Sequence, residues 1–217
     1  MAAVRLSLRA NGVELRLVRD HDIPALGEVI FGLYPNPENE HFTPLLTMGA
    51  RAEDVEATTR NAARYFWSNR SSMTPAQWAL PMAVVRDGVT VGVQDLHATD
   101  FVETRQAASG SYLDPRVQRQ GIGTTMRAMM IEFAFVHLGA TSLMSGYLEG
   151  NEGSAKISSR LGYEHNGVQR LRFRDRSHLE QRLRLTVDRW ADFRPRWLDD
   201  LEVDGVAELR SFLGLEA

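Results

Sequence analysis

One short stretch of the chain carries the strongest structural signal: Leu113-Asp114-Pro115-Arg116-Val117-Gln118-Arg119-Gln120-Gly121-Ile122-Gly123-Thr124. It follows a segment of strand-like composition at 106–113 and leads into an amphipathic segment. There, apolar residues recur on one helical face from Ile122 to Val136, and Gly139 is typical of a helix end. The stretch therefore predicts a loop that joins a strand to a helix of about 16 residues.

Two features of this loop favour binding of a phosphate group. Gly121 and Gly123 have no Cβ, so the backbone can approach a ligand closely. The first amide N–H groups of the helix have no acceptor within it, and the helix dipole adds partial positive charge, so a pyrophosphate binds well there. The loop lacks the Gly-Lys-Ser/Thr of a P-loop and the third glycine of a dinucleotide fingerprint. A tight strand-to-helix turn without a ligand is the structural alternative.

The segments around this loop show alternating strand and helix patterns. Period-two alternation predicts a strand at 13–18, and helical spacing predicts helices at 23–33, ended by Pro35 and Pro37, and at 52–67. Asp87-Gly88 predicts a hairpin turn. The other expected strands are 78–85, 89–96, 106–113, 141–148, 168–174 and 179–187, and a further helix is expected at 151–161.

This order predicts one mixed α/β (α+β) domain over residues 1–187. We expect a central mixed, mostly antiparallel sheet of six to seven strands with helices on both faces. Residues 188–217 contain Trp190, Phe193, Trp197 and a final helical pattern. They are expected to form a C-terminal helical extension that packs on the domain or on the partner in a homodimer.

Composition narrows the class of function. The chain has 217 residues and a formal net charge of −3, which is too small to favour nucleic acid or a membrane surface as a partner. No segment has the apolar length of a signal peptide or a membrane span, which indicates a cytoplasmic protein. The lack of cysteine excludes disulfides and thiolate nucleophiles, and the histidines show no metal-binding spacing, so no metal is expected.

Two motifs together resemble a known family. The loop, read as Gln118-x-x-Gly121-x-Gly123, resembles the coenzyme A loop of GNAT acyltransferases. Further along, Asn151-Glu152-Gly153-Ser154 and Leu161-Gly162-Tyr163 are similar to the pattern of the RimJ/RimL-type branch. The resemblance covers residues 13–187. It implies an N-acyltransferase that moves an acetyl or another short acyl group, such as succinyl, from acyl-coenzyme A to a primary amine by direct attack.

The resemblance also implies roles for individual residues. Backbone groups of Tyr112 and Leu113 would hold the pantetheine arm between two splayed strands. Asn151 would bond to the pantetheine, cap its helix, or both, and Ser154 is the candidate proton donor to the leaving thiolate. Many GNAT enzymes carry a tyrosine acid where this chain has Ser158, so tyrosine acid catalysis is not expected. The loop that would hold the pyrophosphate consists of Gln118, Arg119, Gln120, Gly121, Ile122, Gly123 and Thr124.

The base and the substrates are less determined. An amine with a pKa of about 10 must lose a proton before or during attack. The candidate bases are Asp95, His97, Asp100 and Glu103, of which Asp100 and Glu103 are expected to line the acceptor side. Water alone is the alternative. The acceptor would be a small-molecule amine or a protein N-terminus. The donor would be free acyl-coenzyme A or an acyl-carrier protein. A non-catalytic domain that senses acyl-coenzyme A is the rival function.

A basic cluster lies near the end of the predicted domain, at Arg170, Arg172, Arg174 and Arg176. Alternate residues of a strand share one face, so the cluster is either a solvated edge or a site for an acidic ligand.

Overall fold

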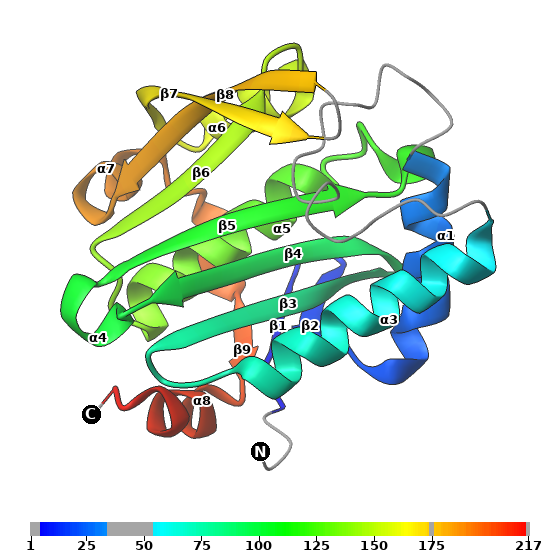
Figure 1. The fold of residues 1–217 in the computed structure, drawn as a ribbon. Coiled ribbons are helices and arrows are strands. Elements are labelled where there is room, and N and C mark those ends of the chain that lie inside the picture. The colour runs from blue at the N-terminus through cyan, green and yellow to red at the C-terminus, as the bar shows by residue number, and fades with distance from the viewer. Residues whose placement is uncertain (1–4, 34–53, 174–175, 216–217) are drawn as a thin grey trace.

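The computed structural model describes residues 5–33, 54–173 and 176–215, without the side chains of Phe173 and Arg176. The described chain folds around one sheet with the strand order β7-β8-β6-β5-β4-β3-β2-β1-β9 (Figure 1). The strands are β1 (Ser7–Ala10), β2 (Val13–Leu17), β3 (Gln77–Arg86), β4 (Val89–Thr99), β5 (Gln106–Leu113), β6 (Ser142–Leu148), β7 (Glu164–Phe173), β8 (Arg176–Thr186) and β9 (Glu202–Asp204). The α-helices are α1 (Ile23–Leu33), α3 (Val55–Ser72), α4 (Phe101–Thr104), α5 (Ile122–Glu132), α6 (Glu152–Arg160), α7 (Val187–Phe193) and α8 (Val206–Leu213).

The expected mixed, mostly antiparallel sheet is confirmed, but the strand number was underestimated. The sheet has nine strands in the described residues, against six to seven expected. The first additional strand, β1, forms a hairpin with β2 through Asn11 and Gly12, which have φ values of 49° and 69°. Asn-Gly is a strong hairpin signal. Strand β1, which precedes this turn, spans only four residues, so it shows little alternation of apolar and polar side chains.

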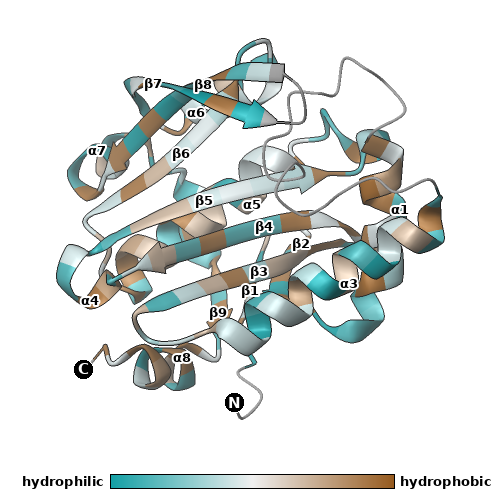
Figure 2. Cartoon of the chain, in the orientation of Figure 1, coloured by the Kyte–Doolittle hydropathy of each residue, from teal (hydrophilic) through white to brown (hydrophobic). Residues whose placement is uncertain are grey.

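Helices cover both faces of the sheet, as expected. Helices α1 and α3 pack on one face against Ala83 and Val85, while α5 lies on the other, against Met82 and Val84 (Figure 1). Neighbouring residues of β3 thus serve opposite cores, because side chains alternate along a strand. In Figure 2, α1 is mostly brown and α3 mostly teal to white, which agrees with the larger buried share of α1.

Some boundaries differ from expectation. Helix α3 extends to Ser72 and so is longer than expected. It begins at Val55 because the Asp54 carboxylate caps its start by accepting from the Ala57 amide at 2.7 Å. The expected helix after Gly121 is formed by α5 and one π-helical turn, Phe133–His137, before Gly139. Pro35 and Pro37 lie outside the described residues.

The C-terminal segment extends the same sheet. Strand β9 pairs antiparallel with β1, and Leu209 and Leu213 of α8 are buried in the same core as the apolar residues of α5. The Trp190 indole Nε1 donates to the buried Glu132 carboxylate at 2.8 Å, and Arg194 Nε donates to it at 2.9 Å. These contacts fix α7 to the end of α5. In the described residues, no helix combines the length and apolar character needed to cross a membrane.

Candidate active site

The central feature of the site is a fork between two parallel strands. β5 and β6 pair only at Gln106–Ser142, Ala107–Leu143 and Ala108–Met144. Beyond these positions β5 stays paired with β4 as far as Leu113, and β6 stays paired with β8 as far as Leu148. Because each strand follows a different neighbour, the two diverge (Figure 1). The edge of β5 beyond Ala108 therefore has no strand partner in the described part of the chain.

The loop after β5 is held by its own side chains. The buried Asp114 carboxylate accepts from the Arg116 backbone amide and from the Arg116 guanidinium. The Arg116 hydrogen bonds lower the pKa of Asp114, although burial opposes the shift. Gln118 Nε2 donates to the Leu113 carbonyl at 3.0 Å, which folds the loop back onto the end of the strand. The loop is therefore ordered and aims the start of α5 at the fork.

The two loop glycines meet different demands. Gly121 stands at the N-cap of α5 with φ of 85°, in the left-handed region, and a Cβ there would face open space. Gly123 lies inside α5, and a Cβ there would come within 3.0 Å of Ile157 Cδ1 on α6. Gly121 thus sets the direction of the first amides, and Gly123 allows α5 and α6 to pack closely.

Helix α6 begins beside the other arm of the fork. The Asn151 side chain caps it by accepting from the Ser154 amide at 3.0 Å, so the capping role expected for Asn151 is present. Ser154 Oγ lies 3.4 Å from Nη2 of Arg127, a buried residue of α5 that the sequence did not single out. Arg127 Nη1 also donates to Ser158 at 2.8 Å.

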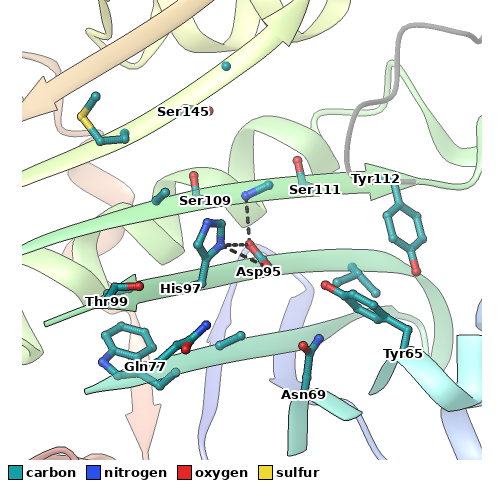
Figure 3. A pocket seen from close by; sticks show the side chains of 18 of the residues that line it. Tyr65, Asn69, Gln77, Asp95, His97, Thr99, Ser109, Ser111, Tyr112 and Ser145 are labelled. Atoms are coloured by element: carbon teal, nitrogen blue, oxygen red, sulfur yellow. Dashed lines mark hydrogen bonds and ion pairs between the residues drawn. The ribbon is translucent and has the colours of Figure 1, made fainter. Parts of the chain in front are cut away.

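A cavity of about 550 Å³ opens on the face of the fork that α3 borders (Figure 3). Its volume lies in the usual range for a small-ligand site. Polar groups gather in it from distant parts of the chain: Tyr65 and Asn69 on α3, Asp95 and His97 on β4, Ser109 and Ser111 on β5, Ser145 on β6, and Glu180 and Arg182 on β8.

Within this cavity, Asp95 and His97 form a pair (Figure 3). His97 Nδ1 lies 3.2 Å and 3.3 Å from the two carboxylate oxygens of Asp95. The hydrogen bond to Asp95 raises the pKa of His97, with burial opposing the shift. Asp95 also accepts from the Gly110 amide of β5 at 3.0 Å, which holds its carboxylate next to the fork.

The structure places Asp100 and Glu103 elsewhere. Asp100 is the N-cap of the short helix α4, with φ of 48°, and both side chains are exposed. Neither residue is among those that line the cavity, whereas Asp95 and His97, the other two candidates, are. Tyr65 and Asn69 had no sequence signal, because they come from a helix whose spacing indicates only packing. Arg170 and Arg172 are exposed on β7, and the side chains of Arg174 and Arg176 lie outside the described residues.

Solved structures share this fold across most of the chain. RimJ of Mycobacterium smegmatis, in complex with a coenzyme A disulfide, has a TM-score of 0.72 and 18% identity, covering 89% of this chain and 92% of that one. The ribosomal-protein-S5-alanine acetyltransferase of Vibrio fischeri has a TM-score of 0.65 and 16% identity, covering 85% and 98%. A GCN5-related N-acetyltransferase of Brucella melitensis has a TM-score of 0.66 and 16% identity, covering 91% and 89%.

A family model assigns the chain more directly. The acetyltransferase (GNAT) domain model matches residues 13–164, which is more than half of the 217 residues. The match contains the fork, the glycine loop, Asp95, His97 and the start of α6. The expected family is confirmed: the chain belongs to the GNAT acetyltransferases.

Proposed function

We propose that this acetyltransferase moves an acyl group, acetyl in the simplest case, from acyl-coenzyme A to a primary amine by direct attack. The observation that carries the proposal is the fork between β5 and β6, with the N-terminus of α5 at one end and a polar cavity on the far face. This arrangement suits a long anionic thioester entering on one side and an amine entering on the other.

Coenzyme A would be held mainly by main-chain groups. The amides at Arg119 to Gly123 lie where the loop enters α5, and the positive end of the helix dipole favours the pyrophosphate there. The pantetheine arm would add to the open edge of β5, between Ser109 and Leu113, as an extra strand does. An N–H group on that edge would polarise the thioester carbonyl and stabilise the oxyanion that forms.

The acceptor would lose its proton to His97. Its Nδ1 faces the Asp95 carboxylate, so Nε2 is the nitrogen left to accept a proton. The protonated amine first gives one proton to His97, which passes it to water. The neutral amine nitrogen then attacks the carbonyl carbon, the C–N bond forms, the C–S bond breaks, and the sulfur keeps the electron pair. His97 takes the second proton from the nitrogen as the amide forms and returns it to water. No covalent enzyme intermediate is required.

The cavity favours a cationic acceptor. Asp95 and Glu180 place two carboxyl groups in its lining, against one guanidinium from Arg182. Burial raises the pKa of Glu180, so its charge forms at a higher pH than usual. An amine arrives protonated at neutral pH, and such a lining attracts it. Small amines and protein N-termini both fit this chemistry, and one of the structural relatives, from Vibrio fischeri, is named as a ribosomal-protein-S5-alanine acetyltransferase.

Thiol release from acetyl-coenzyme A tests the proposal. Small amines, amino acids and short peptides with free N-termini are offered as acceptors, and N-acetylated versions of the same peptides serve as matched controls. We expect turnover only with free amines. Coenzyme A binding by calorimetry without turnover of any amine would support the sensor instead. Turnover only with a loaded carrier protein would assign the donor to that carrier.

A further inference from the structure

A buried arginine lies behind the fork. Arg127 stands on α5 and is only 7% exposed. Its Nη1 donates to Ser158 Oγ at 2.8 Å, and its Nη2 lies 3.4 Å from the hydroxyl oxygens of both Ser111 and Ser154. Strand β5 and helix α6 thus direct three hydroxyl groups at one guanidinium.

This guanidinium has no counter-ion in the described residues. No aspartate or glutamate there forms an ion pair with Arg127, and the nearby Tyr163 phenol, whose pKa is raised by burial, is uncharged at neutral pH. Serine hydroxyls satisfy hydrogen bonds but do not neutralise charge. The buried carboxylates in the described residues each have an arginine partner: Asp22 is paired with Arg16, Asp114 with Arg116, and Glu132 with Arg194. An uncompensated buried charge is costly, and an anion brought close to it is strongly stabilised.

The position of Arg127 and its three serine partners indicates which anion they would stabilise. Ser111 lines the acceptor cavity, so a single hydroxyl separates the guanidinium from it. Ser154 lies in the first turn of α6, beside β6. In the proposed function the thioester sulfur lies between β5 and β6. When the C–S bond breaks, the electron pair remains on that sulfur, and coenzyme A leaves as a thiolate.

We propose that Arg127, acting through the hydroxyl groups of Ser111, Ser154 and Ser158, is a positioning residue that stabilises the coenzyme A thiolate as it leaves. The inference rests on the proposed function. Arg127 supplies charge and oriented hydroxyl donors, not a proton. Burial lowers the pKa of Arg127 from its ordinary value, and a guanidinium remains protonated at neutral pH. The two amine protons pass in turn through His97 to water, and the thiolate takes its own proton from water after release.

The thiol of bound coenzyme A is the most direct readout. The chain contains no cysteine, so ultraviolet thiolate absorbance in the complex comes from coenzyme A alone. We expect the wild-type protein to lower the pKa of the bound thiol by about one unit from that of free coenzyme A, a tenfold gain in the thiolate-to-thiol ratio. Arg127→Met should remove most of this shift. Arg160→Met, which deletes an exposed arginine of α6, should retain it.

Desulfo-coenzyme A controls for the rest of the ligand. The affinity of the wild-type protein for coenzyme A should rise with pH through the lowered thiol pKa, while its affinity for the desulfo analogue should not. In Arg127→Met the two ligands should bind alike across that range. Ser158→Ala keeps the guanidinium and removes one hydroxyl, so an intermediate shift is expected even if Arg127→Met is poorly folded by circular dichroism.

Kinetics supply a second readout. With acetyl-coenzyme A, Arg127→Met should lower kcat by about 10- to 100-fold with a KM change under about threefold, since the interaction is made with the leaving group. S-acetyl-4-nitrothiophenol releases a thiolate that is already stable. With this donor, kcat of the same variant should fall by less than about threefold. A purely structural role for Arg127 would lower both rates equally.

The possible failures are distinct. If coenzyme A does not bind, the proposed function fails. If it binds to the wild-type protein with an ordinary thiol pKa, the role of Arg127 is overturned while the proposed function stands. A third outcome is an ordinary thiol pKa together with a preference for acyl groups with a terminal carboxylate that Arg127→Met abolishes. The guanidinium then binds the carboxylate of the acyl group, and its role toward the thiolate is equally overturned.

Discussion

His97 Nδ1 lies 3.2 Å from Asp95 Oδ1, and both side chains project from the same face of β4 into the cavity. Because the protonated imidazole is favoured by this bond, the pKa of His97 is above its ordinary value near 6.5. A general base works only when neutral, so kcat/KM should rise with pH through that raised pKa. Asp95→Asn should move this limb to lower pH, and His97→Gln should lower kcat/KM by about 100-fold.

The same experiment ranks the other candidate bases. Asp100→Asn and Glu103→Gln change exposed side chains at the N-cap and inside α4 that do not line the cavity, so activity within about twofold of the wild type is expected. If kcat/KM falls about 100-fold in one of these variants but not in His97→Gln, that residue and not His97 is the general base. A pH profile unchanged in Asp95→Asn would leave His97 without its proposed partner.

The glycine loop gives a test with a matched strain control. Gly121→Ala and Gly167→Ala each place a Cβ at positive φ, 85° and 92°, and each Cβ would face open space. Both should therefore cost about 1–2 kcal/mol of backbone strain. Only Gly121 orients the first amides of α5, so only Gly121→Ala should weaken coenzyme A binding, by about tenfold, in calorimetry. Equal affinities for the two variants would contradict phosphate binding at this loop.

The sequence predicted the loop and its helix because local signals there agree. Glycine positions, helical spacing and the Asn151 cap all depend on residues close in the chain, and the structure contains each of these elements. The fork could be expected only through the family resemblance. Its geometry depends on which strand pairs with which, and β5 is separated from β6 by all of α5.

The contents of the cavity were harder to predict. Tyr65 and Asn69 reach it from α3, and Glu180 from β8, so only the tertiary fold brings them together. Arg127 occurs in a helix with a regular apolar spacing, and a single arginine in such a pattern predicts a solvent-exposed side chain. Its burial against serines from β5 and α6 has no counterpart in the pattern. Strand β9 was missed for the same reason, since three residues paired to the distant β1 carry no periodicity.

Stability near the N-terminus should depend on Asp22. Its side chain is 1% exposed and accepts from both Nη atoms of Arg16, from the Arg19 amide and from Thr90. Burial alone would raise the pKa of Asp22, but these hydrogen bonds outweigh it and lower the pKa. Asp22→Asn should therefore reduce the free energy of unfolding by about 3 kcal/mol at pH 7, as measured in urea.

The pH dependence of this loss of stability follows from the direction in which folding shifts the pKa of Asp22. A depressed folded-state pKa stabilises the protein above the unfolded value of about 3.9, and the benefit is lost as pH falls through the folded pKa. The difference between the wild type and Asp22→Asn should thus be greatest near neutral pH and shrink in acid. Asp20→Asn, which alters the neighbouring exposed carboxylate, should have a smaller effect. A difference that stays constant down to strongly acidic pH would rule out ionised Asp22 as its cause.

The C-terminal segment should depend on one carboxylate. Glu132, which is 6% exposed, accepts from Trp190 and Arg194, and these are the polar contacts between α7 and the end of α5. Glu132→Ala leaves a buried indole N–H without an acceptor and a guanidinium without one of its two carboxylates, at a cost of about 2–3 kcal/mol. Hydrogen exchange should accelerate across residues 187–215 with little change in β5 and β6. Asp199→Ala removes only the exposed partner of Arg194 and should leave exchange nearly unchanged. Uniform acceleration over the whole chain in Glu132→Ala would instead mean that this segment unfolds together with the sheet, as the pairing of β9 with β1 would allow.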